Sequence, residues 1–315
     1  MKNNIPEFNA TIGKEFDAKA VKLKKQHSYL TSTYITSLFL GAFFIDLGLK
    51  ENLPLFLGFI FTGIALFIYA YRWNKKSNEQ WTYSRVVAES IKSEWFKYIT
   101  GGGDYPCNET IGEEYYADLL EKNIKEKVDE YRSSLLSISK KPIEFSFQID
   151  SLTRNLRSMS FLDRLERYKK ERIEDQKNWY ENKARIMANK DKMLKISFVV
   201  IVVAGLIVGV TKLFNLEYSG SILVNESDWF SITIALAFAV ENLNSIFQYE
   251  RLGINYKKSA QDLRESLRKI DDKDNDVRSN ENVFSEFVED VENRISNEHK
   301  SWSLTTSSKN LPNFI

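Results

Sequence analysis

Three polar side chains interrupt an apolar stretch late in the sequence. Residues 229–247 read WFSITIALAFAVENLNSIF, so Glu241, Asn242 and Asn244 lie within a segment long enough to cross a membrane. An ionisable residue costs at least ~2.5–3.5 kcal/mol at mid-helix in lipid, so it usually faces a bundle interior or water. At a rise of about 1.5 Å per residue, Glu241 lies about 18 Å from Trp229, in the C-terminal third of the segment. These residues therefore either line a pore or contact other helices, or they lie at the membrane interface. A ring of Glu241 carboxylates would favour cations.

Other kinds of chemistry lack the residues that they need. Cys107 is the single cysteine, which excludes an intrachain disulfide and a thiolate metal cluster. With only His27 and His299, histidine catalysis and a histidine-rich metal site are disfavoured. The glycines at 101–103 lack the Lys-Ser/Thr pair of a phosphate-binding loop. We therefore expect no enzyme activity, no cofactor and no metal. The formal net charge of +1 also gives no general attraction to nucleic acid.

Four apolar segments are long enough to position Glu241 inside a bilayer. Each approaches the ~20 residues that a helix needs to cross ~30 Å of hydrocarbon. The first three are apolar around their whole circumference, which favours contact with lipid over the alternative of buried helices in a soluble core. No cleavable signal peptide is recognisable, so the first segment is expected to persist as an anchor. The four predicted spans are residues 29–49, 52–73, 194–214 and 229–247.

Basic residues near the segment ends predict the orientation of the spans. In and beside the two short connections the only basic residues are Lys50 and Lys212. Both connections are therefore expected to face outward, with the N and C termini and most of the mass in the cytoplasm. The flanking basic residues on the opposite side are Lys19, Lys22, Lys24, Lys25, Arg72, Lys75, Lys76, Lys190, Lys192, Lys195, Arg251, Lys257 and Lys258.

The charged regions are predicted to form long cytoplasmic helices. Ser160 is expected to cap the helix that leads into the third span, with Asp163 three residues on. The helix over 249–270 is expected to continue the fourth span. The fold class is thus an all-α membrane protein with four transmembrane helices, arranged as two hairpins with long cytoplasmic helices. The other expected helices cover residues 7–28, 74–99, 110–136 and 281–302.

The two hairpins resemble copies of one unit. F-x-x-K-A at residues 16–20 corresponds to Y-x-x-K-A at residues 180–184, and the same offset places Gly41 on Gly205. Gly205 and Gly209 form a small-xxx-small motif, and all three glycines are expected to let helices pack closely. The predicted domains are residues 1–140 and 151–315.

A stripe of mixed polar and aromatic residues precedes the third span. Its members are three or four residues apart, so they share one face of a helix. Such a stripe suits a specific helix–helix seam, either within the chain against the 249–270 helix or between copies in an oligomer. The residues are Leu165, Tyr168, Arg172, Gln176, Trp179 and Lys183.

These residues also carry a family resemblance. From Leu156 onward the chain resembles the bacterial SLATT family of two-transmembrane effector domains, which are associated with SMODS nucleotide-signalling and SLOG-domain systems. The first half resembles another branch of the family through Ala88-Glu89-Ser90-Ile91-Lys92 and Trp95. The matching residues of the second half are Leu156, Arg157, Arg164, Tyr168, Arg172, Gln176, Trp179, Tyr180, Lys183 and Ala184.

The resemblance implies a function that composition and spacing do not give. It implies a multi-pass effector of the bacterial inner membrane that oligomerises to form a pore or disrupt the bilayer during antiviral defence. The expected partners are the lipid bilayer, further copies of the chain and a nucleotide-signalling or sensor protein, with no nucleic acid. The alternative is a membrane-anchored scaffold or sensor that recruits cytosolic partners through its helices. A fused pair departs from the usual pattern of one hairpin per chain.

Overall fold

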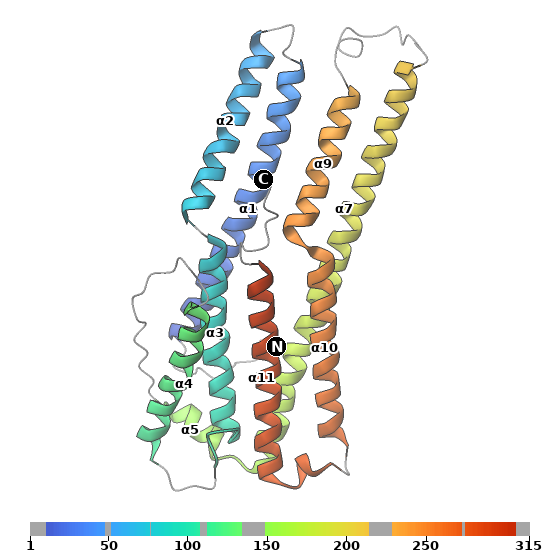
Figure 1. The fold of residues 1–315 in the computed structure, drawn as a ribbon. Coiled ribbons are helices and arrows are strands. Elements are labelled where there is room, and N and C mark those ends of the chain that lie inside the picture. Colours follow the sequence, from blue (N-terminus) through green and yellow to red (C-terminus); the bar gives the residue numbers. More distant parts are fainter. Residues whose placement is uncertain are drawn as a thin grey trace. The chain divides into compact units, whose positions relative to one another are not determined.

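Helices make up most of the described residues of the computed structural model (Figure 1). These residues are 11–47, 52–75, 77–107, 112–133, 149–213, 229–272 and 275–306, and no strand occurs among them. The predicted helical class is confirmed for this part of the chain. The stretch between the two predicted domains, residues 141–150, lies largely outside the described residues, and so do both ends of the expected 110–136 helix. The elements are α1 (Thr11–Leu47), α2 (Asn52–Lys75), α3 (Ser77–Thr100), α4 (Glu113–Ser133), α5 (Ser151–Arg157), α6 (Phe161–Tyr168), the π-helix η1 (Lys169–Glu174), α7 (Asp175–Leu213), α9 (Trp229–Phe247), α10 (Tyr249–Asp271), the 3₁₀-helix η2 (Asp276–Arg278) and α11 (Glu281–Thr306).

Three helical stretches are long and apolar enough to cross a membrane. They are Glu15–Asp46, Leu53–Arg72 and Phe161–Thr211, the last formed by α6, η1 and α7. In the apolar 18-residue segment of each stretch, only 22%, 17% and 6% is buried, respectively. Most side chains of these segments therefore face outward and do not form a soluble core. α9 has the bounds predicted for the fourth span, and its crossing of a membrane stays a prediction.

Glycines set the close approach of α1 and α2. A Cβ on Gly58 would lie 2.6 Å from Ile45 Cγ1 and 2.8 Å from the Ile45 backbone nitrogen. A Cβ on Gly41 would lie 2.5 Å from Thr62 Oγ1, whose hydroxyl donates a 2.9 Å hydrogen bond to the Gly58 carbonyl. The two backbones therefore meet where side chains are absent, as in other tightly packed membrane helices.

The pair formed by α7 and α9 uses a similar contact. A Cβ on Gly205 would lie 2.6 Å from Thr233 Oγ1. Gly209 is one turn further along α7 and is half-buried. In both pairs, then, a glycine in the last third of the first helix faces a threonine of the neighbouring helix, which is the arrangement expected of duplicated units.

The expectation of one helix continuing from 229 to 270 is wrong. Gln248 has φ 47°, in the left-handed region that non-glycine residues rarely adopt, and it separates α9 from α10. Hydrogen bonds from Gln248 N to Asn244 O (2.8 Å) and from Leu252 N to Gln248 O (3.0 Å) bracket the break. The backbone therefore turns at one residue without losing its flanking hydrogen bonds.

The chain divides into two compact units, which we name by their character. The polar unit comprises Met1–Lys24, Ser77–Lys183 and Asn255–Ile315, and the hairpin unit comprises Lys25–Lys76 and Ala184–Ile254. Each unit draws on both halves of the sequence. The predicted domains, residues 1–140 and 151–315, describe a sequence repeat and stay a prediction.

Within the polar unit, α3 is the central helix. Its residues are almost all buried from Trp81 onward, and it packs against α4, α5, α6 and α11. As expected, the Ser160 side chain caps α6 by accepting a 3.2 Å hydrogen bond from Asp163 N.

The glycine contacts predict a pair of unequal alanine substitutions on α2. Gly58→Ala should lower the melting temperature of the purified chain in detergent, because its Cβ meets the Ile45 backbone and overpacking costs about 1–3 kcal/mol. Gly63→Ala is the matched control, since nothing lies within 4 Å of its Cβ. It should leave the melting temperature unchanged or raise it through better helix propensity. Equal effects of the two substitutions would show that this close approach does not occur in the protein.

Candidate functional site

The predicted intramembrane residues are not gathered by the chain itself. Glu241 and Asn242 are exposed on α9, and Asn244 is half-buried. The Asn242 amide donates a 2.8 Å hydrogen bond to Phe238 O of its own helix. The single chain thus presents a carboxylate and an amide on an apolar helix without enclosing them.

The predicted stripe, in contrast, runs into the interior of the polar unit. Tyr168, Arg172 and Gln176 are 0%, 1% and 4% exposed, so they meet neighbours of the same chain. Trp179 is half-buried, and its ring centroid lies 5.6 Å from that of Tyr256 in α10. Lys183 is also half-buried, with Nζ 5.5 Å from the Trp179 ring centroid.

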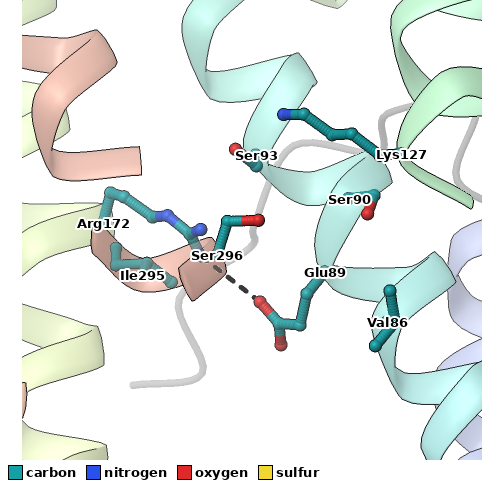
Figure 2. Close-up of a pocket in the computed structure, with 8 residues that line it drawn as sticks. All are labelled: Val86, Glu89, Ser90, Ser93, Lys127, Arg172, Ile295 and Ser296. Atoms are coloured by element: carbon teal, nitrogen blue, oxygen red, sulfur yellow. Dashed lines mark ion pairs between the residues drawn. The ribbon is translucent and has the colours of Figure 1, made fainter. Parts of the chain in front are cut away.

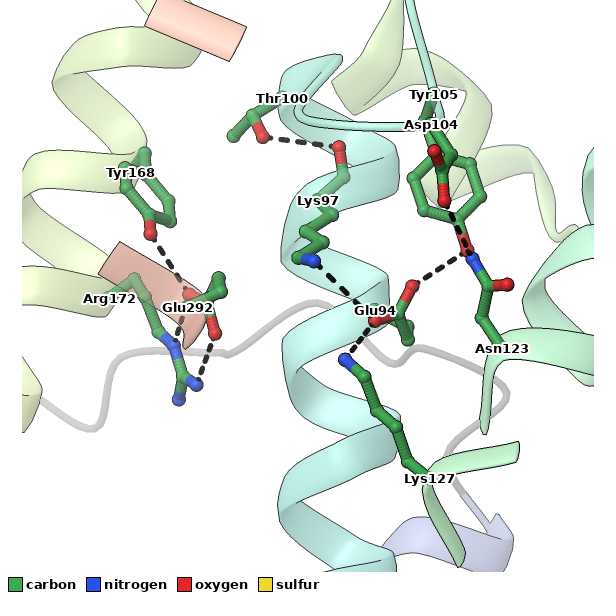
Figure 3. A network of polar contacts seen from close by, with 10 residues as sticks. All are labelled: Glu94, Lys97, Thr100, Asp104, Tyr105, Asn123, Lys127, Tyr168, Arg172 and Glu292. Carbon is green, nitrogen blue, oxygen red and sulfur yellow. Dashed lines mark hydrogen bonds and ion pairs between the residues drawn. The ribbon is translucent and has the colours of Figure 1, made fainter. Parts of the chain in front are cut away.

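The stripe leads to a buried ion pair between η1 and α11. Arg172 donates from Nε to Glu292 Oε1 at 2.8 Å and from Nη2 to Glu292 Oε2 at 2.7 Å (Figure 3). The Tyr168 hydroxyl donates to Glu292 Oε1 at 3.0 Å. Both side chains of the pair are fully buried. This two-point geometry is the strongest form that a guanidinium–carboxylate contact takes.

The charges of this cluster are fixed by their neighbours. Burial alone would lower the pKa of Arg172, but Glu292 and then Glu89 raise it by more, so the guanidinium stays charged. Burial and the Glu292 carboxylate raise the pKa of Tyr168 well above its ordinary value, so Tyr168 acts as a neutral donor. The arrangement is suited to holding helices together.

A second charged cluster surrounds Glu94 of α3. Its carboxylate forms an ion pair with Lys127 of α4, lies 3.9 Å from Lys97 Nζ and accepts a 2.8 Å hydrogen bond from the Tyr105 hydroxyl (Figure 3). The Asn123 side-chain amide donates a 3.1 Å hydrogen bond to the Tyr105 hydroxyl oxygen. Burial alone would raise the pKa of Glu94, but Lys127 and Lys97 lower it by more, so Glu94 is ionised. These contacts fasten α4 to α3.

Arg157 of α5 and Arg164 of α6 hold the end of α3. Arg164 Nη1 donates to Thr100 O at 3.0 Å, and Arg164 also forms an ion pair with Glu281. Arg157 Nη2 donates to Pro106 O at 2.8 Å and to Tyr105 O at 3.1 Å. The glycine-rich turn that follows α3 has positive φ at Gly101 (77°) and Gly103 (58°), a conformation that glycine adopts readily. The Arg164–Glu281 ion pair also joins α6 to the first residue of α11.

Sequence reasoning missed the acidic members of these clusters. Glu89 was recognised only as part of a family motif, and Glu94 and Glu292 were not singled out. One signal was present for Glu292, because it shares a helical face with Val288, Val291 and Ile295. A single acidic residue among apolar neighbours on an amphipathic helix predicts a buried partner of opposite charge.

The buried ion pair predicts a marked asymmetry between single and double substitutions. Arg172→Met or Glu292→Leu alone should lower the free energy of unfolding by about 3–5 kcal/mol, because each leaves the opposite charge buried. Combining the two should recover much of that loss. Denaturant unfolding of the purified variants measures all three values. Arg294→Met is the control, because the Arg294–Asp290 pair is surface-exposed and should contribute less than about 1 kcal/mol. Additive losses in the double variant would contradict the ion pair.

The Glu94 cluster predicts a stability difference that depends on pH. A carboxyl whose pKa is lowered by folding stabilises the fold above its ordinary pKa, 4.5 for Glu94. That contribution is lost as the pH falls through the lower value of the folded protein. The stability difference between wild type and Glu94→Gln should therefore be constant near neutral pH and shrink below about pH 4.5. Thermal unfolding across this range measures it, and a difference that grows toward low pH would have the wrong sign.

Comparison with known families finds two matches in tandem along the chain. Residues 13–165 match "SMODS and SLOG-associating 2TM effector domain 3", and residues 168–302 match "SMODS and SLOG-associating 2TM effector domain 1". A search of curated proteins and a search of solved structures found no match. The two matched regions together cover most of the chain and confirm the resemblance drawn from its motifs. The chain therefore belongs to the SLATT family and carries two of its membrane effector domains in tandem.

Proposed function

We propose that this membrane effector acts by oligomerising and by forming a pore or disrupting the inner membrane of a bacterium. The observation that carries the proposal is the exposed Glu241 carboxylate on the apolar helix α9. In a lone chain within lipid this group is costly, whereas copies that gather around a common axis place it against water or polar neighbours. Oligomerisation thus relieves a cost that is built into the sequence.

The proposed topology has four spans in two hairpins with both termini in the cytoplasm. α9 supplies the fourth span beside α7, its partner at the Gly205–Thr233 contact. The concentration of Lys and Arg outside the two short connections supports this orientation. The polar unit would then receive the activating signal, from a nucleotide-signalling or sensor protein of the same defence system. The proposal involves no catalytic residue, cofactor or nucleic acid.

A membrane-anchored scaffold or sensor is the second candidate. It is favoured by apolar side chains exposed on the polar unit around α5 and α6: Leu152 (39%), Met159 (39%) and Leu162 (51%). Exposed apolar residues that lie close in sequence on a charged unit suit the recruitment of a protein partner. In this role the spans would serve only as an anchor.

Glu241 provides the test between the two candidates. Cells that express the chain with its activating partner should lose membrane potential, and Glu241→Ala should weaken this loss several-fold because the carboxylate ring is removed. Glu265→Ala is the matched control, since Glu265 is exposed on α10 outside the apolar segments and should leave the loss of potential unchanged. Membrane potential and dye exclusion report the result.

Two outcomes would count against the pore. Intact potential and intact dye exclusion on activation would exclude any disruption of the membrane. If Glu241→Ala is silent and Leu162→Glu abolishes capture of the activating partner, the scaffold role is favoured instead.

A further inference from the structure

We propose that a single buried water molecule binds between Glu89, Ser93 and Arg172 and bridges the two SLATT domains. The site is a small cavity between α3, η1 and α11 in the polar unit (Figure 2). Its volume, ≈ 10 Å³, reaches the roughly 10–15 Å³ that one water molecule requires. The inference concerns the matched domains and does not depend on pore formation.

The polar atoms around the cavity have the spacing of a water-mediated contact. Arg172 Nη1 and Glu89 Oε2 are 3.7 Å apart, which is too long for a direct hydrogen bond, and a water molecule in the cavity beside them can bond to both atoms. Arg172 uses Nε and Nη2 on Glu292, so Nη1 is the donor left for the cavity. Neither this Nη1 nor Ser93 Oγ has a hydrogen-bond partner among the described residues, and both atoms are buried.

Water is the ligand whose chemistry fits all three groups. It can accept a hydrogen bond from Arg172 Nη1, donate one to Glu89 Oε2 and exchange a third with the Ser93 hydroxyl. Three hydrogen bonds are typical of buried water in proteins. An anion would meet the Glu89 carboxylate, and a cation would meet Arg172 and Lys127, so the mixed charge disfavours both.

The π-helix accounts for the position of Arg172 in this cavity. η1 spans Lys169–Glu174 and carries Arg172 and Ile173 as its buried residues. A π-turn is rare and frequently marks a functional position in a helix. Here its wide turn holds a guanidinium between two carboxylates, one on α11 and one on α3.

The water would connect the two matched domains at their cores. Glu89 and Ser93 lie within residues 13–165, and Arg172 lies within residues 168–302. The direct pair Arg172–Glu292 lies wholly within the second match. The bridge through water therefore extends that ion pair across the boundary between the domains.

A high-resolution structure of the full chain is the direct test. We expect a peak of solvent density within hydrogen-bond distance of Arg172 Nη1 and Glu89 Oε2 in the wild type. The peak should be absent from Ser93→Val, whose added methyl groups occupy the cavity. A wild-type map without this peak, or with Arg172 and Glu89 in direct contact, would overturn the proposal. An anomalous peak after bromide soaking would identify an anion and overturn it as well.

Stability provides a second readout on buried serines of the same helix. Ser93→Ala removes one partner of the water and should lower the melting temperature by several degrees, with a larger loss for Ser93→Val. Ser84→Ala is the matched control, because Ser84 is 1% exposed and its hydroxyl bonds to Gln80 O of its own helix. It should have little effect. A Ser93→Val protein that is as stable as the wild type would show that no bridging water is needed there.

Discussion

The packing of the polar unit depends on the buried contact between Arg172 and Glu292. A guanidinium and a carboxylate that are both withdrawn from water are tolerated only when each is nearly fully hydrogen-bonded. The two Arg172–Glu292 hydrogen bonds, of 2.7 and 2.8 Å, therefore hold η1 against α11. The Tyr168 hydroxyl donates a further hydrogen bond to Glu292. The aromatic rings follow, since Tyr168 packs edge-on against Phe96 of α3 and Phe284 of α11. One polar contact thereby sets the register of several helices.

The same contact explains how a tandem protein can form one polar core. α3, α4, α5 and most of α6 lie within the first match, and η1 and most of α11 lie within the second. Arg172 reaches Glu89 across this boundary, and Arg164 forms an ion pair with Glu281 across it. Fusion of the two domains in one chain makes these contacts intramolecular, so they do not pay the entropy of bringing two chains together.

The helices of the hairpin unit are held together by a different kind of contact. Its helices approach at Gly41, Gly58 and Gly205, where van der Waals contact replaces the hydrophobic effect that lipid cannot supply. On the apolar helix α9 of this unit, the polar side chains of Glu241 and Asn242 are exposed. The polar unit is held by buried ion pairs, whereas α9 of the hairpin unit exposes polar side chains, and this contrast supports the proposed association of further copies through the hairpin unit.

The sequence by itself determined what depends on local pattern. The apolar runs predicted the bounds of α9 and the positions of the other apolar helices. The position of Ser160 predicted the N-terminal cap of α6, and the spacing of glycines predicted close contacts between helices. Only the tertiary structure decided which carboxylates are buried, because Glu292 and Arg172 are 120 residues apart and charge alone does not name a partner. The π-turn at η1 and the left-handed conformation of Gln248 could not be predicted from the sequence either, since their residues are ordinary helix formers. Such departures from helical geometry persist because surrounding contacts compensate their cost, and a single sequence does not show those contacts.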